Sequence, residues 1–308
     1  MNISFFSVDD YGKIVGKELI KRGYNVVFDT IEDNTDIVFA MCCPSTYALY
    51  LYLNKRMEQD NFHYKGKVVS NVLDIPYWRL DDSRFQKYYD RYREMINLSD
   101  HVTTISQTTS DQLKSLWNVD SDVLFTVFNN KKLETYMKEK TRYPSTIVCV
   151  GRFSPPKNFD SVIRALKGTS WSLKIIGYGG TELTRYRDLI NELGIFGEIL
   201  FNPSDEYVVN ELCRATVVVH PSLFEGLSLV PKEALYCNAP VLISDIPVHR
   251  EYHKDTVTYI TPDDINDLRD KIINRKWKSA ALGKKELEQY TIEKTTDKVE
   301  AWLLKHLK

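Results

Sequence analysis

Two glutamates stand eight positions apart in the segment FEGLSLVPKEAL, residues 224–235. Glu225 and Gly226 follow an apolar run and predict a loop, and Ser228 is of a type preferred at helix N-caps. Glu233 then falls in the first turns of the expected helix. Because a carboxylate accepts hydrogen bonds from two adjacent hydroxyl groups, the pair suits a ligand with hydroxyls at both ends and phosphates between them. The alternative is an exposed Glu225 and a Glu233 that interacts only with the helix dipole.

Two cations lie five positions apart upstream, Arg152 and Lys157 in the segment VGRFSPPKNFDSVIRAL at 150–166. Gly151 ends a predicted strand there, and the next helix is expected to open at Lys157 and Asn158. Free amides at a helix N-terminus with two nearby cations would form a site for a phosphate or diphosphate. The alternative is an arginine and a lysine that are solvated in a loop.

A glycine turn, IIGYGG at 175–180, follows another predicted strand. Gly177 would let the backbone approach a ligand closely. The turn is not the GxGxxG fingerprint that a dinucleotide-binding dehydrogenase carries after its first strand, so that class of enzyme is not indicated.

Short β-branched runs alternate with amphipathic helical patterns along the chain. The predicted strands cover residues 3–8, 25–29, 36–41, 67–73, 101–106 and 123–128, and then 146–153, 172–178, 197–202, 216–221, 240–244 and 256–260. The helical patterns are clearest at 12–22 and 82–98. Because parallel strands need crossover connections of about a dozen residues, this alternation predicts parallel α/β sheets.

Two domains are expected because a chain of 308 residues is about twice the usual domain length. The polar stretch at 129–145 marks the boundary, giving an N-terminal domain at 1–135 and a C-terminal domain at 136–290. A last helix at 291–308 must dock on one of the two domains, the N-terminal one included, through an apolar stripe of Val299, Trp302, Leu303 and Leu307. Ligands of such paired sheets bind beyond the carboxyl ends of the strands, in the crevice between them.

The composition excludes some classes of function. The formal charge is −1, so nothing favours a nucleic-acid partner. Five cysteines, an odd number set mostly in apolar runs, fit reduced thiols and predict a cytoplasmic protein. No apolar run approaches the roughly 18 residues that would span a bilayer, and the start of the chain lacks the pattern of a signal peptide.

The segments at 151–166, 173–180 and 217–251, together with DHVTTISQTTSDQLK at 100–114, resemble glycosyltransferase family 4. The resemblance implies the GT-B fold, which is two Rossmann-like parallel α/β domains facing a central cleft. It also implies transfer of a sugar from a nucleotide donor with retention at the anomeric carbon. The match is dense from about residue 146 to 264 and thin before 100, and the spacing of Glu225 and Glu233 fits the E-x7-E motif of the family.

The resemblance implies a role for each motif residue. Glu233 would hold the donor ribose and Glu225 would contact the transferred sugar, while Arg152 and Lys157 would stabilise the charge that grows on the leaving diphosphate. The backbone amides expected at the sugar and the diphosphate belong to Gly226, Leu227, Ser228 and Leu229. Further donor contacts are expected at Gly151, Gly177, Asn202 and Pro203, the last two in the segment FNPSDE that would read the base through its backbone.

The implied reaction is a front-face substitution through an oxocarbenium-like state, in which the departing diphosphate oxygen takes the proton of the acceptor hydroxyl. No protein nucleophile, metal ion or cofactor is required, because the two cations neutralise the charge. The nucleotide sugar is then a substrate, and both UDP and GDP donors remain open.

The chain departs from the family pattern mostly in its N-terminal half. The glycine-rich loop after the first strand is reduced to SVDDYGKIVG at 7–16, where Gly12 is a candidate diphosphate contact or a plain helix start. A histidine that is usual near the end of the fourth strand is absent, so Asp74 is the candidate contact to the donor sugar or the acceptor. His220 is interpreted as structural, and nothing in the sequence explains Lys232 where an apolar residue is usual.

We therefore expect a cytoplasmic, retaining hexosyltransferase that moves a hexose from a UDP- or GDP-sugar to a glycan or a lipid-linked acceptor. An aromatic and basic surface on the N-terminal half would serve sugar stacking or contact with the inner face of a membrane, although tyrosines at helical spacing are also typical of a core. Its residues are Tyr77, Trp78, Arg79, Tyr88, Tyr89 and Tyr92. The alternative functions are a non-catalytic subunit that binds nucleotide sugars and a GT-B nucleotide-sugar epimerase.

Overall fold

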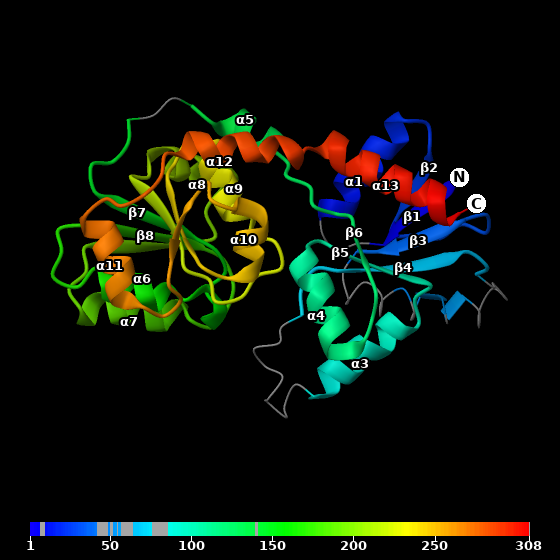
Figure 1. The fold of residues 1–308 in the computed structure, drawn as a ribbon, viewed down its shortest axis with the longest axis horizontal. Coiled ribbons are helices and arrows are strands. Elements are labelled where there is room, and N and C mark those ends of the chain that lie inside the picture. Colours follow the sequence, from blue (N-terminus) through cyan, green and yellow to red (C-terminus); the bar gives the residue numbers. More distant parts are fainter. Residues whose placement is uncertain are drawn as a thin grey trace. The chain divides into compact units, whose positions relative to one another are not determined.

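Two compact units make up the computed structural model (Figure 1). The structure describes residues 1–6, 10–41, 49, 52–53, 55–56, 64–75, 86–138 and 141–307. Unit 1 comprises Met1–Val127 and Tyr290–Lys308, and unit 2 comprises Phe128–Gln289. The chain thus enters unit 2 before the predicted boundary at 135/136, because the helix Lys131–Tyr136 packs on the helix Asp205–Arg214 of unit 2.

A six-stranded parallel sheet forms the centre of unit 1, in the order β2-β1-β3-β4-β5-β6. Its strands are β1 (Asn2–Phe6), β2 (Asn25–Phe28), β3 (Ile37–Ala40), β4 (Lys67–Val72), β5 (His101–Thr104) and β6 (Asp122–Val123). The helices are α1 (Asp10–Lys21), α3 (Gln86–Asn97), α4 (Gln107–Trp117) and α13 (Ile292–His306). β3 is buried on both sides, as expected of a parallel strand covered on both faces.

The apolar stripe of α13 is buried in unit 1, where the helix lies along α1 (Figure 1). Val299, Trp302 and Leu303 are buried, and the Trp302 ring packs on Phe39 of β3. Trp302 Nε1 donates a hydrogen bond of 2.8 Å to Asp122 Oδ2. The last helix therefore completes the core of the unit that contains the start of the chain.

Unit 2 is built on a second six-stranded parallel sheet, in the order β12-β11-β10-β7-β8-β9. Its strands are β7 (Thr146–Val150), β8 (Ser172–Gly177), β9 (Gly197–Phe201), β10 (Val217–His220), β11 (Val241–Ser244) and β12 (Thr258–Ile260). The α-helices are α5 (Lys131–Tyr136), α6 (Phe159–Ala165), α7 (Leu183–Glu192), α8 (Asp205–Arg214), α9 (Leu229–Tyr236), α10 (Pro247–His253), α11 (Ile265–Ile273) and α12 (Ala280–Glu286). The 3₁₀ turns are η3 (Pro155–Lys157) and η4 (Leu287–Gln289).

Helices cover both faces of this sheet. α6 packs between α7 and α11 on one face, and α9 packs between α8 and α12 on the other (Figure 1). Phe153, Phe159 and Tyr186 fill the core on the α6 side with the alternating side chains of β7, β8 and β10. Local signals fix the helix starts, since the Asp264 side chain accepts from the amides of Asn266 and Asp267 at the start of α11.

Each predicted strand overlaps a strand of the structure, and most of the predicted strands run a few residues too long. The prediction at 123–128 is mostly wrong, because it shares only Val123 with β6. The predicted helix at 12–22 is α1, and the described part of the one at 82–98 is α3. Tyr89 and Tyr92 of α3 are buried, so these two belong to the core and not to an aromatic surface. Tyr77, Trp78, Arg79 and the side chain of Tyr88 lie outside the described residues.

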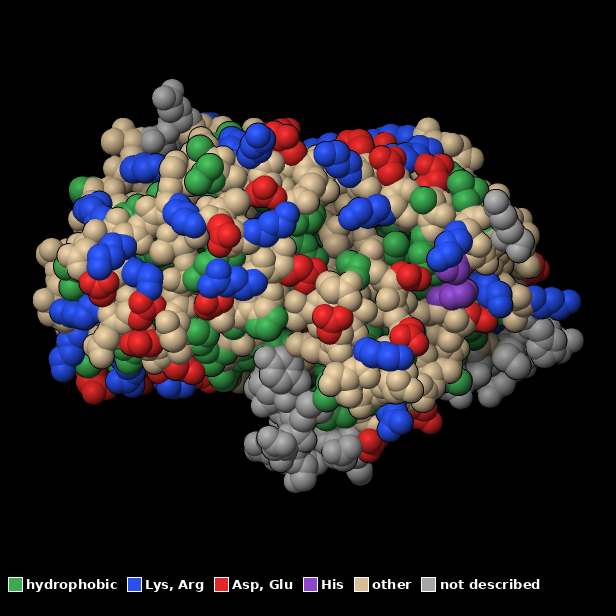
Figure 2. Space-filling view, in the orientation of Figure 1, with side chains coloured by type: hydrophobic (Ala, Val, Ile, Leu, Met, Phe, Trp, Pro, Cys, Tyr) green, Lys and Arg blue, Asp and Glu red, His purple; other side chains and the backbone are tan. Residues whose placement is uncertain are grey.

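Surface charges of both signs are interspersed over the face shown in Figure 2. That distribution agrees with the near-zero net charge and shows no basic patch on this face that would attract a polyanion. Among the described helices, none has both the length and the apolar character needed to cross a bilayer.

Candidate functional site

The turn after β7 and the loop after β10 meet at the carboxyl edge of the sheet in unit 2. β7 and β10 are neighbours, and the chain continues to β8 on one side of this pair and to β11 on the other. Open α/β sheets bind their ligands at such a switch point. The amide of Leu223 donates to the carbonyl of Pro156 at 2.8 Å, which joins the two loops.

Lys157 and Glu225 form an ion pair across these two loops, between Nζ and Oε1. Lys157 lies in η3 and not in an α-helical first turn as predicted, because Asn158 adopts a left-handed φ of 51° and α6 begins only at Phe159. A Cβ on Gly151 would lie 3.5 Å from Lys157 Cδ, so the lysine stem runs over this glycine at the end of β7.

The carboxylate of Glu225 is held ionised by its surroundings. Its side chain is 12% exposed and that of Lys157 is 21% exposed. Burial alone would raise the pKa of Glu225, but the Lys157 ammonium and a hydrogen bond from His220 lower that pKa well below its ordinary value. The site therefore presents a fixed negative charge beside a fixed positive one.

A buried cluster of two histidines and three serines lies behind Glu225. His220 Nε2 is 3.1 Å from Glu225 Oε1 and 3.2 Å from the hydroxyl oxygens of both Ser222 and Ser228. The Ser228 hydroxyl also lies 2.8 Å from His249 Nε2. Ser244 completes this histidine–serine cluster (His220, Ser222, Ser228, Ser244 and His249), since its carbonyl oxygen is 2.8 Å from His249 Nδ1.

Ser228 occupies the N-cap position of α9, as predicted, but its side chain makes no capping hydrogen bond. Its hydroxyl is used by the two histidines instead. Gly226 and Leu227 before it are buried, and Leu229, the first residue of α9, is half-buried. The predicted amide-bearing loop is therefore packed against the rest of unit 2.

Glu233 lies on α9 among neighbours that differ from those of Glu225. It is half-buried, and no hydrogen bond or ion pair engages its carboxylate within the described part of the chain. Burial raises the pKa of Glu233, while the charge of Lys132 opposes that rise and the charge of Asp205 adds to it. Lys132 and Asp205 pair at 2.5 Å, so the charges that act on Glu233 belong to α5 and to the start of α8.

The ends of β7, β8 and β9 are brought together by glycine. A Cβ on Gly177 would lie 1.9 Å from the carbonyl oxygen of Gly151, so only glycine allows β8 to approach the end of β7. The amide of Asn202 donates to the carbonyl of Gly177 at 2.7 Å. Asn202, exposed with a φ of 53°, and the half-buried Pro203 follow β9 at this edge.

Arg152 is exposed and does not join the ion pair of Lys157 and Glu225. Its guanidinium carbon lies 5.9 Å from the centre of the Tyr178 ring, a residue that is 56% exposed. The structure thus places Arg152 on the β8 side of the switch point and Lys157 on the β10 side. The two predicted cations flank the end of β7 from opposite directions.

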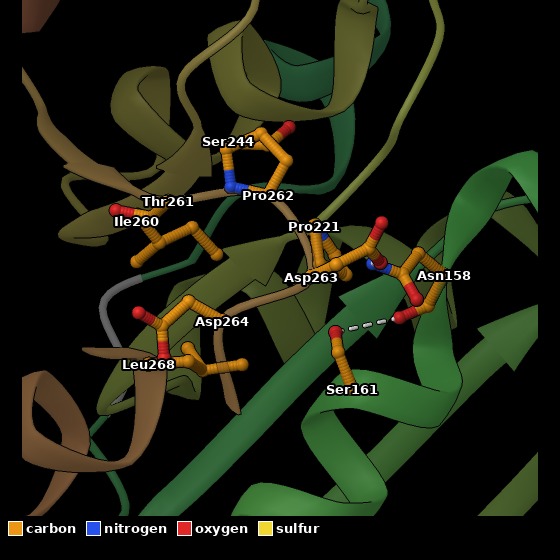
Figure 3. Close-up of a pocket in the computed structure, with 10 residues that line it drawn as sticks. All are labelled: Asn158, Ser161, Pro221, Ser244, Ile260, Thr261, Pro262, Asp263, Asp264 and Leu268. Carbon is orange, nitrogen blue, oxygen red and sulfur yellow. Dashed lines mark hydrogen bonds between the residues drawn. The ribbon is translucent and has the colours of Figure 1, made fainter. Parts of the chain in front are cut away.

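A small cavity of about 10 Å³ lies behind the Lys157 turn (Figure 3). Asn158 and Ser161 line it from the β7 side, Pro221 and Ser244 from the ends of β10 and β11, and the loop 261–264 closes it. Its volume corresponds to about one water molecule, so it is no binding site for a sugar. It is a solvent-sized gap where the loops of four strands converge.

The two candidates in unit 1 lie at the carboxyl edge of its sheet. Gly12 is buried in α1, and a Cβ there would lie 2.6 Å from Met41 Cγ, so packing against the end of β3 accounts for this glycine. Asp74 is exposed after β4, and its carbonyl accepts a 2.7 Å hydrogen bond from Tyr92. Over the described ranges, no three His, Cys, Asp or Glu side chains gather in a way that would hold a metal ion.

Lys232, unexplained by the sequence, has a definite place in the structure. Its side chain is fully buried, and Nζ lies 4.0 Å from the centre of the Tyr252 ring on α10. Burial lowers the pKa of Lys232 to about 7, although the charge of Glu251 opposes this. The lysine therefore joins α9 to α10 behind the site.

His249 and Ser244 are the residues near the site that sequence reasoning missed. They belong to β11 and α10, outside the strand-end glycine and E-x7-E signals. The available signal was the spacing of His249 and His253, because residues four positions apart lie on one face of a helix and both imidazoles are buried there.

Comparison with known proteins identifies relatives across this region. Residues 131–293, just over half of the chain, match the family described as glycosyl transferases group 1. The O-antigen chain mannosyltransferase RfbU of Salmonella typhimurium is 33% identical over 213 residues, covering 66% of this chain and 59% of the relative. The serotype-specific mannosyltransferase WbdA of Escherichia coli is 23% identical over 215 residues, covering 62% of this chain and 26% of the relative. The chain thus spans less than two thirds of these curated relatives.

Solved structures share the fold over nearly the whole chain. Sucrose-phosphate synthase from Thermosynechococcus elongatus superposes with a TM-score of 0.76 at 13% identity, covering 99% of this chain and 98% of that one. Anabaena HepE, solved in complex with UDP and glucose, gives a TM-score of 0.72 at 13% identity, covering 99% and 100%. The predicted GT-B fold is confirmed by these likenesses together with the two parallel sheets.

Proposed function

Because the chain belongs to the glycosyl transferases group 1 family, we propose that it transfers a hexose from a UDP- or GDP-sugar to a glycan or a lipid-linked acceptor, with retention at the anomeric carbon. The observation that carries this proposal is the contact between Lys157 and Glu225 at the switch point of the sheet in unit 2. A cation for the diphosphate and a carboxylate for the sugar hydroxyls stand there side by side.

The donor would lie along the edge formed by the ends of β10, β7, β8 and β9. Glu225 would bind a hydroxyl of the transferred sugar, and Lys157 and Arg152 would contact the diphosphate from the two sides of Gly151. Glu233, whose carboxylate is half-buried and carries no hydrogen bond within the described residues, would accept from the ribose hydroxyls. Asn202 and Pro203 shortly precede Asp205, whose charge acts on Glu233, and their backbone would contact the base.

The bond changes balance without a protein nucleophile. The bond from the anomeric carbon to the diphosphate oxygen breaks, the bond to the acceptor oxygen forms on the same face, and the acceptor proton passes to the leaving diphosphate. Lys157 and Arg152 would stabilise the negative charge that develops on that group. We expect turnover to persist in the presence of EDTA, since these cations do the work that a metal ion would otherwise do.

The names of the relatives favour one choice of donor hexose. Two of them are called mannosyltransferases, which favours a mannosyl donor within the proposed class. The structural neighbour solved with UDP and glucose keeps a UDP-sugar in the set to be screened. An acceptor at the inner face of a membrane, with contact through unit 1, is part of the same proposal.

The proposal is tested by incubating the purified protein with UDP- and GDP-hexoses and measuring release of the nucleoside diphosphate. We expect slow hydrolysis of one donor, loss of that activity in Glu225→Ala, and nucleotide affinity in this variant within about threefold of wild type. Asp245→Asn is the matched control, because it breaks an exposed ion pair with Arg250 in the same unit.

The alternatives predict different results. Donor binding without turnover by the wild type would favour the non-catalytic subunit. Conversion of the donor to an epimeric free or nucleotide-linked sugar would favour the epimerase. A wild type that neither binds nor turns over any nucleotide sugar in the panel contradicts all three.

A further inference from the structure

The His249 ring lies between a carbonyl oxygen, which faces Nδ1, and a hydroxyl group, which faces Nε2. Nδ1 lies 2.8 Å from the carbonyl oxygen of Ser244, which can only accept, so Nδ1 carries the proton. Burial and the neighbouring His220 lower the pKa of His249 to about 3, so the ring is neutral and Nε2 is a bare acceptor. The hydroxyl of Ser228, 2.8 Å away, must then donate its proton to His249 Nε2.

The direction of the Ser228 hydroxyl proton affects which nitrogen of His220 is protonated. With its proton directed to His249, the Ser228 oxygen offers only lone pairs to His220 Nε2 at 3.2 Å. Glu225 Oε1, at 3.1 Å from the same nitrogen, is also an acceptor only. Two of the three oxygen atoms around Nε2 can thus do nothing but accept, and the third, the Ser222 hydroxyl, can do either.

The opposite nitrogen of His220 does not settle the tautomer. His220 Nδ1 is buried and has no hydrogen-bond partner among the residues that the structure describes. The position of the ring proton is therefore fixed from the Nε2 side alone. Burial also lowers the pKa of His220, which keeps the ring neutral so that its single proton has to lie on one nitrogen or the other.

We propose that His249 is a positioning residue for the reaction: through Ser228 it holds His220 as the Nε2–H tautomer, and this N–H fixes the carboxylate of Glu225 beside Lys157. The proposal rests on the function proposed above for its effect on turnover, and on the geometry alone for the tautomer. Without His249, the Ser228 hydroxyl is released to donate to His220 Nε2. The Nδ1–H form of His220, in which a lone pair of Nε2 faces the charge of Glu225, then becomes populated beside the Nε2–H form that Glu225 still favours.

Three variants test this proposal. His249→Phe removes both hydrogen bonds of the ring, and His249→Gln keeps an amide oxygen that can accept from Ser228. His253→Phe is the matched control, because His253 is equally buried four residues along the same short helix and takes no part in the histidine–serine cluster. Thermal unfolding of all three variants shows whether each is folded at the assay temperature.

The first readout is the tautomer of His220, measured from the ¹⁵N chemical shifts of its ring in selectively labelled protein. We expect the Nε2–H form in wild type, in His249→Gln and in His253→Phe, and the Nδ1–H form or a mixture in His249→Phe. An unchanged Nε2–H form in a folded His249→Phe protein overturns the proposal. This measurement needs no substrate and no turnover.

The second readout is donor turnover against pH. In His249→Phe we expect kcat to fall about 10-fold, the loss of one hydrogen bond to a charged group, with KM changed less than about threefold. The acidic limb of kcat should move to higher pH, because Glu225 loses the His220 donor and, among the charged groups that the structure describes around it, keeps the Lys157 ammonium. His249→Gln should recover most of kcat, and His253→Phe should match wild type.

The two proposals fail in distinguishable ways. Equal losses of kcat in His249→Phe, His249→Gln and His253→Phe, without a shift of the acidic limb, would contradict the positioning role even if the enzyme is active. A tautomer change in His249→Phe together with a wild type that turns over no donor would support the effect of His249 on the His220 tautomer and overturn the proposed function.

Discussion

The ion pair between Lys157 and Glu225 should contribute measurably to the stability of unit 2, unlike an exposed pair in the same unit. The perturbation is a double-mutant cycle of Lys157→Met, Glu225→Gln and both together. The reference cycle is Arg250→Met with Asp245→Asn, whose side chains are 47% and 40% exposed. The Lys157 and Glu225 side chains are 21% and 12% exposed, so water screens their attraction less.

The magnitude follows from the separation of the charges and their burial. Two unit charges about 3 Å apart attract by roughly 5 kcal/mol at an effective dielectric constant of about 20. Desolvation of both groups offsets much of this, and the net value of a hydrogen bond to a charged group is about 1.5–3 kcal/mol. We expect a coupling free energy of about 2 kcal/mol for Lys157 with Glu225, and about 0.5 kcal/mol for the exposed pair.

The pH dependence has a definite sign. The pKa of Glu225 is lowered in the folded protein from its ordinary value of 4.5, so its stabilisation is fully present above pH 4.5. It is lost as the pH falls below that value towards the folded-state pKa. The coupling should therefore be equal at pH 7 and pH 5.5 and smaller at pH 3.5.

Urea-dependent hydrogen exchange of the amides in β7 and β10 is the suitable assay, because it reports unfolding of unit 2 without assuming that both units unfold together. A coupling for Lys157 and Glu225 within about 0.5 kcal/mol of that for Arg250 and Asp245 would refute the reasoning. So would a coupling that grows as the pH falls.

Three further predictions concern neighbouring residues. Gly177→Ala should lower the free energy of unfolding, measured in urea, by at least about 2 kcal/mol, because the new Cβ would lie 1.9 Å from the Gly151 carbonyl oxygen. The control Gly168→Ala should lower it by only about 1 kcal/mol, because that position has open space around it and only its φ of 70° is unfavourable for alanine. In wild type the free energy of unfolding should rise from pH 7 to pH 10 by up to about 1.4 kcal/mol per pH unit. The reason is that Lys232 is mostly deprotonated in the folded state and protonated in the unfolded state over this pH range. Lys232→Met should remove this rise. Glu233→Gln should weaken binding of the preferred nucleotide about 10-fold by calorimetry while its melting temperature stays near that of wild type, and an unchanged affinity would remove Glu233 from the donor site.

Much of the fold follows from the sequence, because alternating β-branched runs and amphipathic helices leave few arrangements other than parallel sheets. The sequence placed Lys157 and Glu225 at strand ends of one domain, but it gave no order of the strands, so their ion pair is seen only in the structure, where β7 and β10 are neighbours. The hydrogen bonds of Ser228 could not be predicted in this way. Its residue type predicts a helix cap, but its hydroxyl is taken by two histidines that approach from other elements.

The state of the site could not be predicted because it depends on burial and on distant partners. His220 appears structural from its place at a strand end, yet it contacts Glu225 directly. Lys232 has no explanation along the chain and gains one only from the ring of Tyr252 on the next helix. Tyr89 and Tyr92 are of a residue type that often stacks on sugars, but both side chains are buried in the core. In each case the deciding neighbour lies on another element.

A crystal structure of the protein with the nucleotide sugar that binds best tests the central claim most directly. We predict that Lys157 Nζ lies within hydrogen-bond distance of a diphosphate oxygen, that Glu225 accepts from a hydroxyl of the sugar, and that Glu233 accepts from the ribose. A donor bound elsewhere, with the ion pair of Lys157 and Glu225 untouched, would contradict the account.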